Sequence, residues 1–366
     1  MATNSFRVTL PDDTPVGLCF EPTLALANHS CSPNATIVFN GRTIALQALS
    51  EIKAEEQIFI SYVDPIQPRD FRRQELRERY FFTCQCTVCQ LNETPYQTTL
   101  RLNNTSASST KREHLSLLWW NEDYISKASQ LQERHSKFKL SAKQIEGAQL
   151  FINRTRKTQK IEFLHAGFQI LRPQISHRLY AIPPLPALLN ELYLYHLSQD
   201  QYIETLVILL FISLHLDPHT YPQLHHPIRV TRLYTLATLF KHISSLPTVS
   251  LFPSSSRSSK LNEDQQHAIR NLDFISANQV FLIFAFEAGT KSHGEDSVFV
   301  KEIKEALADV EDVQKMRGDG MVGRELRRWM AQGDVAVEGK LLVETILGGL
   351  SDVVGMIGTV IDGVEI

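Results

Sequence analysis

The part of the chain that decides its fold reads Asn28-His29-Ser30-Cys31-Ser32-Pro33-Asn34. Further along, residues 55–62 read Glu-Glu-Gln-Ile-Phe-Ile-Ser-Tyr, and three cysteines follow at positions 84, 86 and 89. Cysteine and histidine are common metal ligands, and tyrosine and asparagine supply hydrogen-bonding groups. These three stretches are therefore the first candidates for a functional site.

The cysteine spacing is the strongest chemical signal that can be read without any comparison. Cys84-x-Cys86-x-x-Cys89 offers three thiolates within a short piece of chain. Zinc takes four tetrahedral ligands, so this group is one ligand short. The fourth ligand has to come from a distant residue, and Cys31, Cys19 and His29 are the candidates.

Two alternatives apply to the cysteines. Cys19 lies between Leu18 and Phe20, in a context typical of a strand, and is more simply interpreted as an ordinary buried residue. Three cysteines as close as Cys84, Cys86 and Cys89 contribute little to packing a core, whereas their spacing suits the binding of one metal ion. An iron–sulfur cluster is an alternative occupant, although such clusters usually draw on other spacings.

All three stretches together resemble a known family. Residues 28–34 resemble the NHSCxPN motif of SET-domain lysine methyltransferases, and residues 55–62 resemble the family's GEELxIxY element. The cysteines at 84–89 stand where the post-SET zinc cysteines belong. Asn4-Ser5-Phe6, Val38–Gly41 and the run from Arg72 to Phe82 are similar to the branch that pairs SET with a MYND zinc finger.

The resemblance implies a fold. A small irregular β-sheet would form the C-terminal half of a SET domain, with the NHSC segment passing beneath the loop before Tyr62 in a knot-like crossing. Such crossings are rare in proteins. The resemblance also implies that Cys31 joins Cys84, Cys86 and Cys89 on one structural zinc ion.

The resemblance further implies methyl transfer from S-adenosylmethionine to a protein lysine, on a histone or another protein. Because a free lysine has a pKa of about 10.4, the amine has to lose its proton first, and an apolar aromatic channel favours the neutral form. By resemblance, Tyr62 is the catalytic tyrosine. The implied cofactor contacts are Asn4, Asn28, His29 and Phe82, and the implied channel residues are Phe6 and Tyr80.

The chain as a whole is predicted to be α+β. We expect the SET half at 1–64, a post-SET zinc segment at 65–92, a linker at 93–110, a tetratricopeptide-like helical domain at 111–316 and a variable extension at 317–366. Strands are predicted at 6–10, 35–39, 43–49 and 57–63 from apolar alternation, and Asn40-Gly41 predicts a hairpin turn between two of them.

Helical patterns follow the β-rich part. Residues 69–82 are charged and helical in pattern. Apolar residues at helical spacing recur around 188–195 and 203–214, and a helix is predicted to end at Arg172-Pro173. Further helices are predicted at 226–243, 262–288 and 296–316.

Some family features are not found in this sequence. The glycine-rich cofactor strand, the first SET strands and the MYND cysteines are missing, and Ala54 stands where the family has a glycine. We therefore expect an N-terminally truncated relative. It is either a shortened form of an active enzyme or an inactive, zinc-stabilised scaffold that binds protein partners through its helical domain.

Bulk composition narrows the function classes. The chain has 366 residues, a net charge of −3, 43% hydrophobic and 21% charged residues. Neither the charge nor the pattern favours a zinc-ribbon-like nucleic-acid binder. We see no signal peptide and no uninterrupted apolar stretch of about 18 residues. A nuclear or cytoplasmic protein with no membrane contact is expected.

Overall fold

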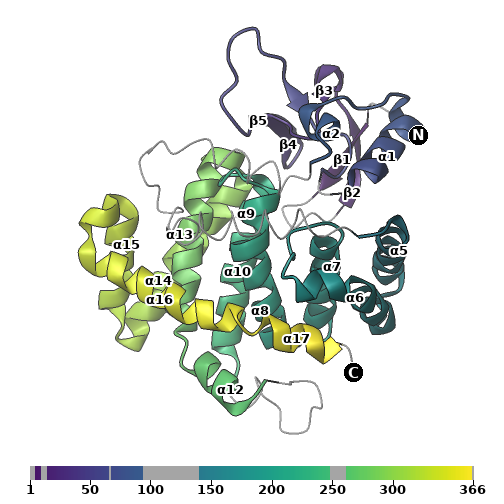
Figure 1. Cartoon of the computed structure of the whole chain (residues 1–366). Coiled ribbons are helices and arrows are strands. Elements are labelled where there is room, and N and C mark those ends of the chain that lie inside the picture. Colours follow the sequence, from purple (N-terminus) through teal and green to yellow (C-terminus); the bar gives the residue numbers. More distant parts are fainter. Residues whose placement is uncertain (1–4, 10–14, 66, 94–139, 248–260, 365–366) are drawn as a thin grey trace.

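The structure is a computed structural model that describes residues 5–9, 15–65, 67–93, 140–247 and 261–364 (Figure 1). Among the described residues, short strands, two α-helices and one 3-10 helix (Leu24–Leu26) form the N-terminal part, and the remainder is helical. The predicted mixed class with a helical second part is confirmed. The predicted linker from residue 94 onward, the predicted helical residues 111–139 and the serine-rich residues 253–259 lie outside the described residues.

The described strands pair two by two. Strand β1 (Ser5–Thr9) is antiparallel to β2 (Pro15–Phe20), and β4 (Ala35–Asn40) is antiparallel to β5 (Thr43–Ala48). The hairpin predicted at Asn40-Gly41 is confirmed, and Gly41 has a φ of 58°, which favours glycine. Strand β3 (Asn28–His29) runs parallel to β6 (Phe59–Ile60) and brings the two motif segments together.

Strand β6 is much shorter than the predicted run 57–63, because side chains of the NHSC segment take the place of a partner strand. The Asn34 amide donates to the Gln57 carbonyl over 2.9 Å and accepts from the Phe59 amide over 2.8 Å. The Tyr62 amide donates to the His29 ring over 3.0 Å. The backbone around β6 is therefore satisfied without a longer ladder.

Helix α1 (Arg69–Tyr80) confirms the helix predicted for residues 69–82. It ends where Phe81 adopts a left-handed conformation with a φ of 61°. The short helix α2 (Thr87–Gln90) follows and carries Cys89. This turn of the chain brings all three cysteines back toward the NHSC segment.

Among the residues described after position 139, the first helix begins at Ala142, and most consecutive helices pack against one another. The first of these helices are α5 (Ala142–Thr158), α6 (Ile161–Ser176), α7 (Leu185–Ser198), α8 (Tyr202–Phe211), α9 (Asp217–Thr220), α10 (Pro227–Ser245), α12 (Glu263–Arg270), α13 (Phe274–His293) and α14 (Val298–Arg317). A π-helical turn (Ile212–Leu216) joins α8 to α9. The helices predicted at 226–243 and 296–316 are confirmed as α10 and α14.

Two helix predictions were wrong. The helix expected to stop at Arg172-Pro173 runs on to Ser176, since a proline near a C-terminus removes only one hydrogen bond. The single helix expected at 262–288 is two, α12 and α13, bent by 68°. The Asp273 carboxylate accepts from the amides of Ile275 and Ser276, which starts α13 anew.

The residues predicted as a variable extension continue the helical core. They form α15 (Gly320–Gln332), α16 (Val337–Val354) and α17 (Ile357–Val364). In Figure 1, α16 and α17 cross the face of the preceding helices. Trp329 is fully buried, and its ring lies edge-on to Phe284 with centroids 5.9 Å apart.

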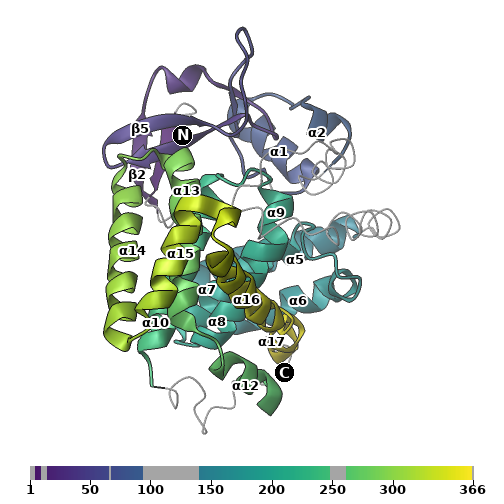
Figure 2. The same cartoon turned by 90° about the vertical axis from the view of Figure 1, so that its left-hand side faces the viewer.

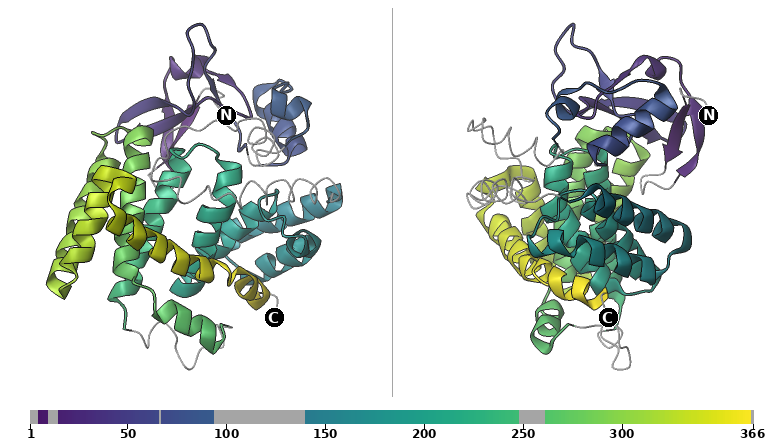
Figure 3. Two further views of the ribbon diagram at one scale, coloured as in Figure 1. Left: turned by 60° about the vertical axis from the view of Figure 1, so that its left-hand side comes forward. Right: turned by 45° about the vertical axis from the view of Figure 1, so that its right-hand side comes forward.

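The β-rich part sits at one end of the helices (Figures 2 and 3). The β4–β5 hairpin is joined to them at two points. The Val298 amide at the start of α14 donates to the Asn40 side chain over 3.1 Å, and His225 lies 3.4 Å from the Ala48 carbonyl. A cleft remains beside these contacts.

Within the described part of the chain, two helical segments are long and apolar enough to cross a membrane by length and composition alone, and the bent pair α12 and α13 would be a third if it formed one span. Tyr202–Thr220 is 83% buried within the fold, so its apolar character is explained by the core. Val337–Asp362 is 33% buried. The expected absence of membrane contact stays a prediction.

Candidate metal centre and adjoining aromatic cleft

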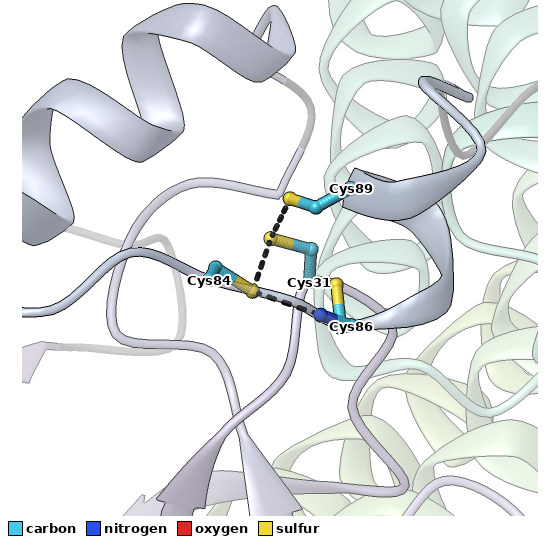
Figure 4. A group of neighbouring side chains, drawn as sticks. All are labelled: Cys31, Cys84, Cys86 and Cys89. Atoms are coloured by element: carbon cyan, nitrogen blue, oxygen red, sulfur yellow. Dashed lines mark hydrogen bonds between the residues drawn. The ribbon is translucent and has the colours of Figure 1, made fainter.

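Four cysteines converge at the junction of the NHSC segment and the chain after α1 (Figure 4). Cys31 Sγ lies 3.6 Å from Cys89 Sγ and 4.0 Å from Cys84 Sγ. The four sulfur atoms, including that of Cys86, all lie within 4.8 Å of one another. Of the candidates for the fourth ligand, the fold brings in Cys31, whereas Cys19 pairs with Phe6 in the β1–β2 hairpin.

This donor set fits a tetrahedral zinc ion. Zn–S bonds of about 2.3 Å place the sulfurs of a tetrahedral site about 3.8 Å apart, and the observed separations bracket that value. Cys31, Cys84 and Cys89 are buried, and Cys86 is half-buried. The predicted ligands Cys31, Cys84, Cys86 and Cys89 are therefore assembled by the fold as one chelate.

The pKa values of the clustered thiols depend on one another. Hydrogen bonding to Cys31 lowers the pKa of Cys86 to about 4. Burial raises the pKa of Cys84 to about 11, and the hydrogen bond to Cys86 together with burial raises that of Cys31. Of these three thiols, that of Cys86 ionises most readily. A divalent ion is the natural partner that would hold all four as thiolates.

Two arginines of α1 flank the cluster. Arg73 donates to the Cys89 carbonyl over 3.3 Å. Arg72 is fully buried, and its Nη1 donates to the carbonyls of Pro65 and Gln67. Within the described residues, Nε and Nη2 of Arg72 have no hydrogen-bond partner. Its positive charge favours the thiolate form of Cys31, against the larger effects that raise the pKa of that thiol.

Aromatic rings form a second group next to the cysteines. The Tyr62 ring centroid lies 4.8 Å from that of Tyr80, 5.3 Å from that of His29 and 6.4 Å from that of Phe82. The Tyr62 hydroxyl donates to the Ala27 carbonyl over 2.5 Å. Burial raises the pKa of Tyr62, so this hydroxyl stays protonated at neutral pH.

The aromatic group opens into a cleft of about 1040 Å³ between the β-rich part and the helices. Its lining on one side includes Phe6, Tyr62 and Tyr80, and on the other side Asn190, Tyr195 and His226. Charged residues in the lining are largely paired, as in the 2.7 Å contact between Arg156 and Glu191. The cleft therefore offers aromatic and hydrogen-bonding surface rather than a strong charge.

The predicted site residues fall in this region with one exception. Asn4 lies outside the described residues. Phe6, Tyr62 and Tyr80 line the cleft, and Phe82 packs beside His29, with ring centroids 5.9 Å apart. Asn28 lies on β3 and is exposed. Sequence reasoning missed Ala27, Arg72 and the helical wall of the cleft, because only the fold places them here.

With this geometry known, comparison with known proteins becomes informative. The SET domain family model matches residues 9–63. That span contains the NHSC segment, both strands that hold it and Tyr62. Residues 9–63 are thus similar in sequence to a SET domain.

The relatives agree with this assignment. Over 90 residues the chain is 41% identical to mouse "Histone-lysine N-methyltransferase SMYD3", covering 25% of this chain and 21% of that protein. It is 38% identical over 86 residues to human "N-lysine methyltransferase SMYD2", covering 24% and 20%. "SET domain and MYND-type zinc finger protein 6" of Schizosaccharomyces pombe is 36% identical over 98 residues, covering 27% and 20%. The matched region spans about a fifth of the length of each relative.

Proposed function

We propose that this chain acts in S-adenosylmethionine-dependent N-methylation of protein lysines. The observation that carries the proposal is the position of Tyr62, whose hydroxyl is fixed to the Ala27 carbonyl at the inner end of an aromatic cleft. A zinc-stabilised scaffold would need the cysteine cluster, but it would not need an oriented tyrosine hydroxyl beside an open channel. The SET segment supports the catalytic interpretation.

The side chains of the cleft suit a lysine substrate. The rings of Tyr62, Tyr80 and Phe6 offer apolar walls that disfavour an ammonium ion and so favour loss of its proton to solvent. The neutral amine then has a free electron pair, and the Tyr62 hydroxyl and the Ala27 carbonyl are placed to orient it. Aromatic faces also stabilise the methylated, cationic product.

S-adenosylmethionine would supply an electrophilic methyl group, whose bond to sulfur breaks as the bond to the lysine nitrogen forms. Asn28, His29 and Phe82 lie on the side of Tyr62 that adjoins the cysteine cluster, and they are the described residues proposed to contact this cofactor. The zinc ion is proposed to be structural, since four cysteines leave it no open position. The knot-like crossing and the post-SET role of residues 65–92 belong to the same proposal.

The proposed substrates are lysine-bearing proteins, histone or non-histone, because one relative is named a histone-lysine N-methyltransferase and another simply an N-lysine methyltransferase. The peptide would enter between the β-rich part and the helices, where Tyr195 and Asn190 line the same cleft as Tyr80 and Tyr62. A protein partner on the helical domain and a nuclear or cytoplasmic location remain part of the proposal.

The test is methyl transfer from labelled S-adenosylmethionine to histones and to a mixed protein substrate. Tyr62→Phe is expected to lower kcat about 100-fold, because a misplaced amine loses alignment with the methyl group. Tyr202→Phe is the matched control, since the Tyr202 hydroxyl donates to Asp200 at an exposed position. Equal activity of the Tyr62→Phe variant and the parent chain would contradict the proposal.

A further inference from the structure

His29 uses both ring nitrogens, and each contact reaches a different part of the site. Its Nδ1 accepts the Tyr62 backbone amide over 3.0 Å. Its Nε2 lies 3.3 Å from the Sγ of Cys31. One imidazole therefore connects a sulfur of the cysteine cluster to the backbone of the residue that carries the cleft hydroxyl.

The hydrogen-bond partners of the neutral His29 imidazole define its tautomer. A backbone amide can only donate, so the Nδ1 of His29 has to present its lone pair to Tyr62. The remaining proton of the neutral ring is then on Nε2, where it points at Cys31. The contact is thus an N–H···S hydrogen bond with a defined direction, from the imidazole to the sulfur.

We infer that His29 is a positioning residue that couples the metal centre to Tyr62, donating to the metal-bound Cys31 sulfur and accepting from the Tyr62 amide. A thiolate held by a metal is a stronger acceptor than a thiol, so occupancy of the centre strengthens the N–H···S bond. That bond fixes the ring, and the fixed ring holds the backbone from which the Tyr62 ring projects. The consequence for catalysis rests on the proposed function, whereas the coupling itself does not.

Packing around the ring supports this role. His29 lies against Tyr62 and Phe82, with centroids 5.3 Å and 5.9 Å away, so rotation about its side-chain bonds is restricted. Parallel pairing of His29 with Ile60 fixes the backbone on the same side. The Ser30 amide also donates to the Ile60 carbonyl over 3.0 Å. His29 is therefore held from its backbone and from both ring nitrogens.

The direct test uses the full chain with its zinc replaced by ¹¹³Cd and its histidines labelled with ¹⁵N. We expect the His29 Nε2 proton to show a scalar coupling to ¹¹³Cd through the sulfur, and the Nδ1 shift to be that of an unprotonated nitrogen. An Nδ1–H tautomer, or a bound ¹¹³Cd with no coupling to this proton, would overturn the inference. Neither readout depends on methyl transfer, so failure of this inference can be distinguished from failure of the proposed function.

Two variants separate the two contacts. The oxygen of an Asn side chain falls near the position of Nδ1, whereas the nitrogen of a Gln side chain falls near that of Nε2. His29→Asn is expected to release zinc to a chelator about tenfold faster while the Tyr62 amide stays protected from hydrogen exchange. His29→Gln is expected to keep slow zinc release but to expose the Tyr62 amide about fivefold more.

A merely structural histidine would give a different result, because both variants would then change both readouts to the same extent. That outcome would overturn the inference. If either variant failed to fold, the ¹¹³Cd coupling in the parent chain would still decide the matter.

Discussion

At the scale of single residues, the buried guanidinium of Arg72 is the clearest unassigned feature of the site. Four thiolates and one divalent ion carry a net charge of −2, which is costly to bury without a nearby cation. Arg72 is fully buried, and its charge acts on Cys31. Replacing Arg72 by an uncharged residue is therefore expected to weaken metal binding in addition to any effect on the stability of α1.

We predict that Arg72→Gln lowers zinc affinity about tenfold or more, as other changes next to metal ligands do. Competition with a chromogenic chelator measures this. Arg69→Gln is the matched control on the same helix, because Arg69 pairs with the exposed Asp70 at its surface. An Arg72→Gln variant with the affinity of the parent would show that Arg72 has no electrostatic role at the metal.

The residue scale also shows what sequence alone can predict of this site. Spacing predicted the cysteine triplet and the need for a distant ligand, and the motif predicted Cys31. Ala27 could not be found in the same way, because it acts through its backbone carbonyl. Nothing in the sequence distinguishes Arg72 from the other arginines of α1. The turn of the chain after Tyr80 places it beside the cysteine cluster.

At the scale of elements, the pairing of α15 with α16 depends on a close approach at Gly339. A methyl group added to Gly339 would lie 2.4 Å from the Glu325 carbonyl oxygen and 2.6 Å from Trp329 Cβ. Gly348 lies on the same helix, and a methyl group there would meet nothing within 4 Å. The two glycines thus form a natural comparison.

We predict that Gly339→Ala lowers the free energy of unfolding by about 1–3 kcal/mol through overpacking. Gly348→Ala is expected to raise it by up to about 1 kcal/mol, since alanine favours a helix. Denaturant unfolding measures both. A Gly339→Ala variant as stable as the parent would mean that residues 320–364 do not share the core.

Helices and strands were predicted well where neighbouring residues determine them. Their ends were predicted poorly where a side-chain contact determines them. The hairpin at Asn40-Gly41 and the helix after Pro68 needed only local signals. The break at Asp273 was missed because the apolar spacing continues across it. Helix α6 passed its proline because Gln174, at its end, donates to the carbonyls of Leu179 and Ile182 and so anchors the turn.

At the scale of the whole molecule, the helical part holds His219 in its interior and His226 at the wall of the cleft. Burial lowers the pKa of His219 and of His226 to about 3. A histidine with a depressed pKa contributes stability that is present above its unfolded pKa of about 6.5 and is lost as the pH falls. As the pH falls below about 6.5, these two histidines bind protons in the unfolded chain but not in the folded chain.

We predict that the free energy of unfolding falls between pH 7 and pH 5 by about 2 kcal/mol for each of these two histidines. His219→Gln should remove its share of the slope. Comparison with the parent chain cancels the titration of the neighbouring buried Asp217. An identical pH slope in His219→Gln and the parent would contradict the burial of this imidazole.

The claim on which the account depends most is that the NHSC segment and the three later cysteines hold one metal ion. Elemental analysis of zinc in the purified full chain tests it most directly, with Cys31→Ser as the variant and Cys19→Ser as its matched control. The account predicts one zinc per chain, lost or greatly reduced in Cys31→Ser and unchanged in Cys19→Ser. A chain without zinc, or one that keeps its zinc in Cys31→Ser, would contradict it.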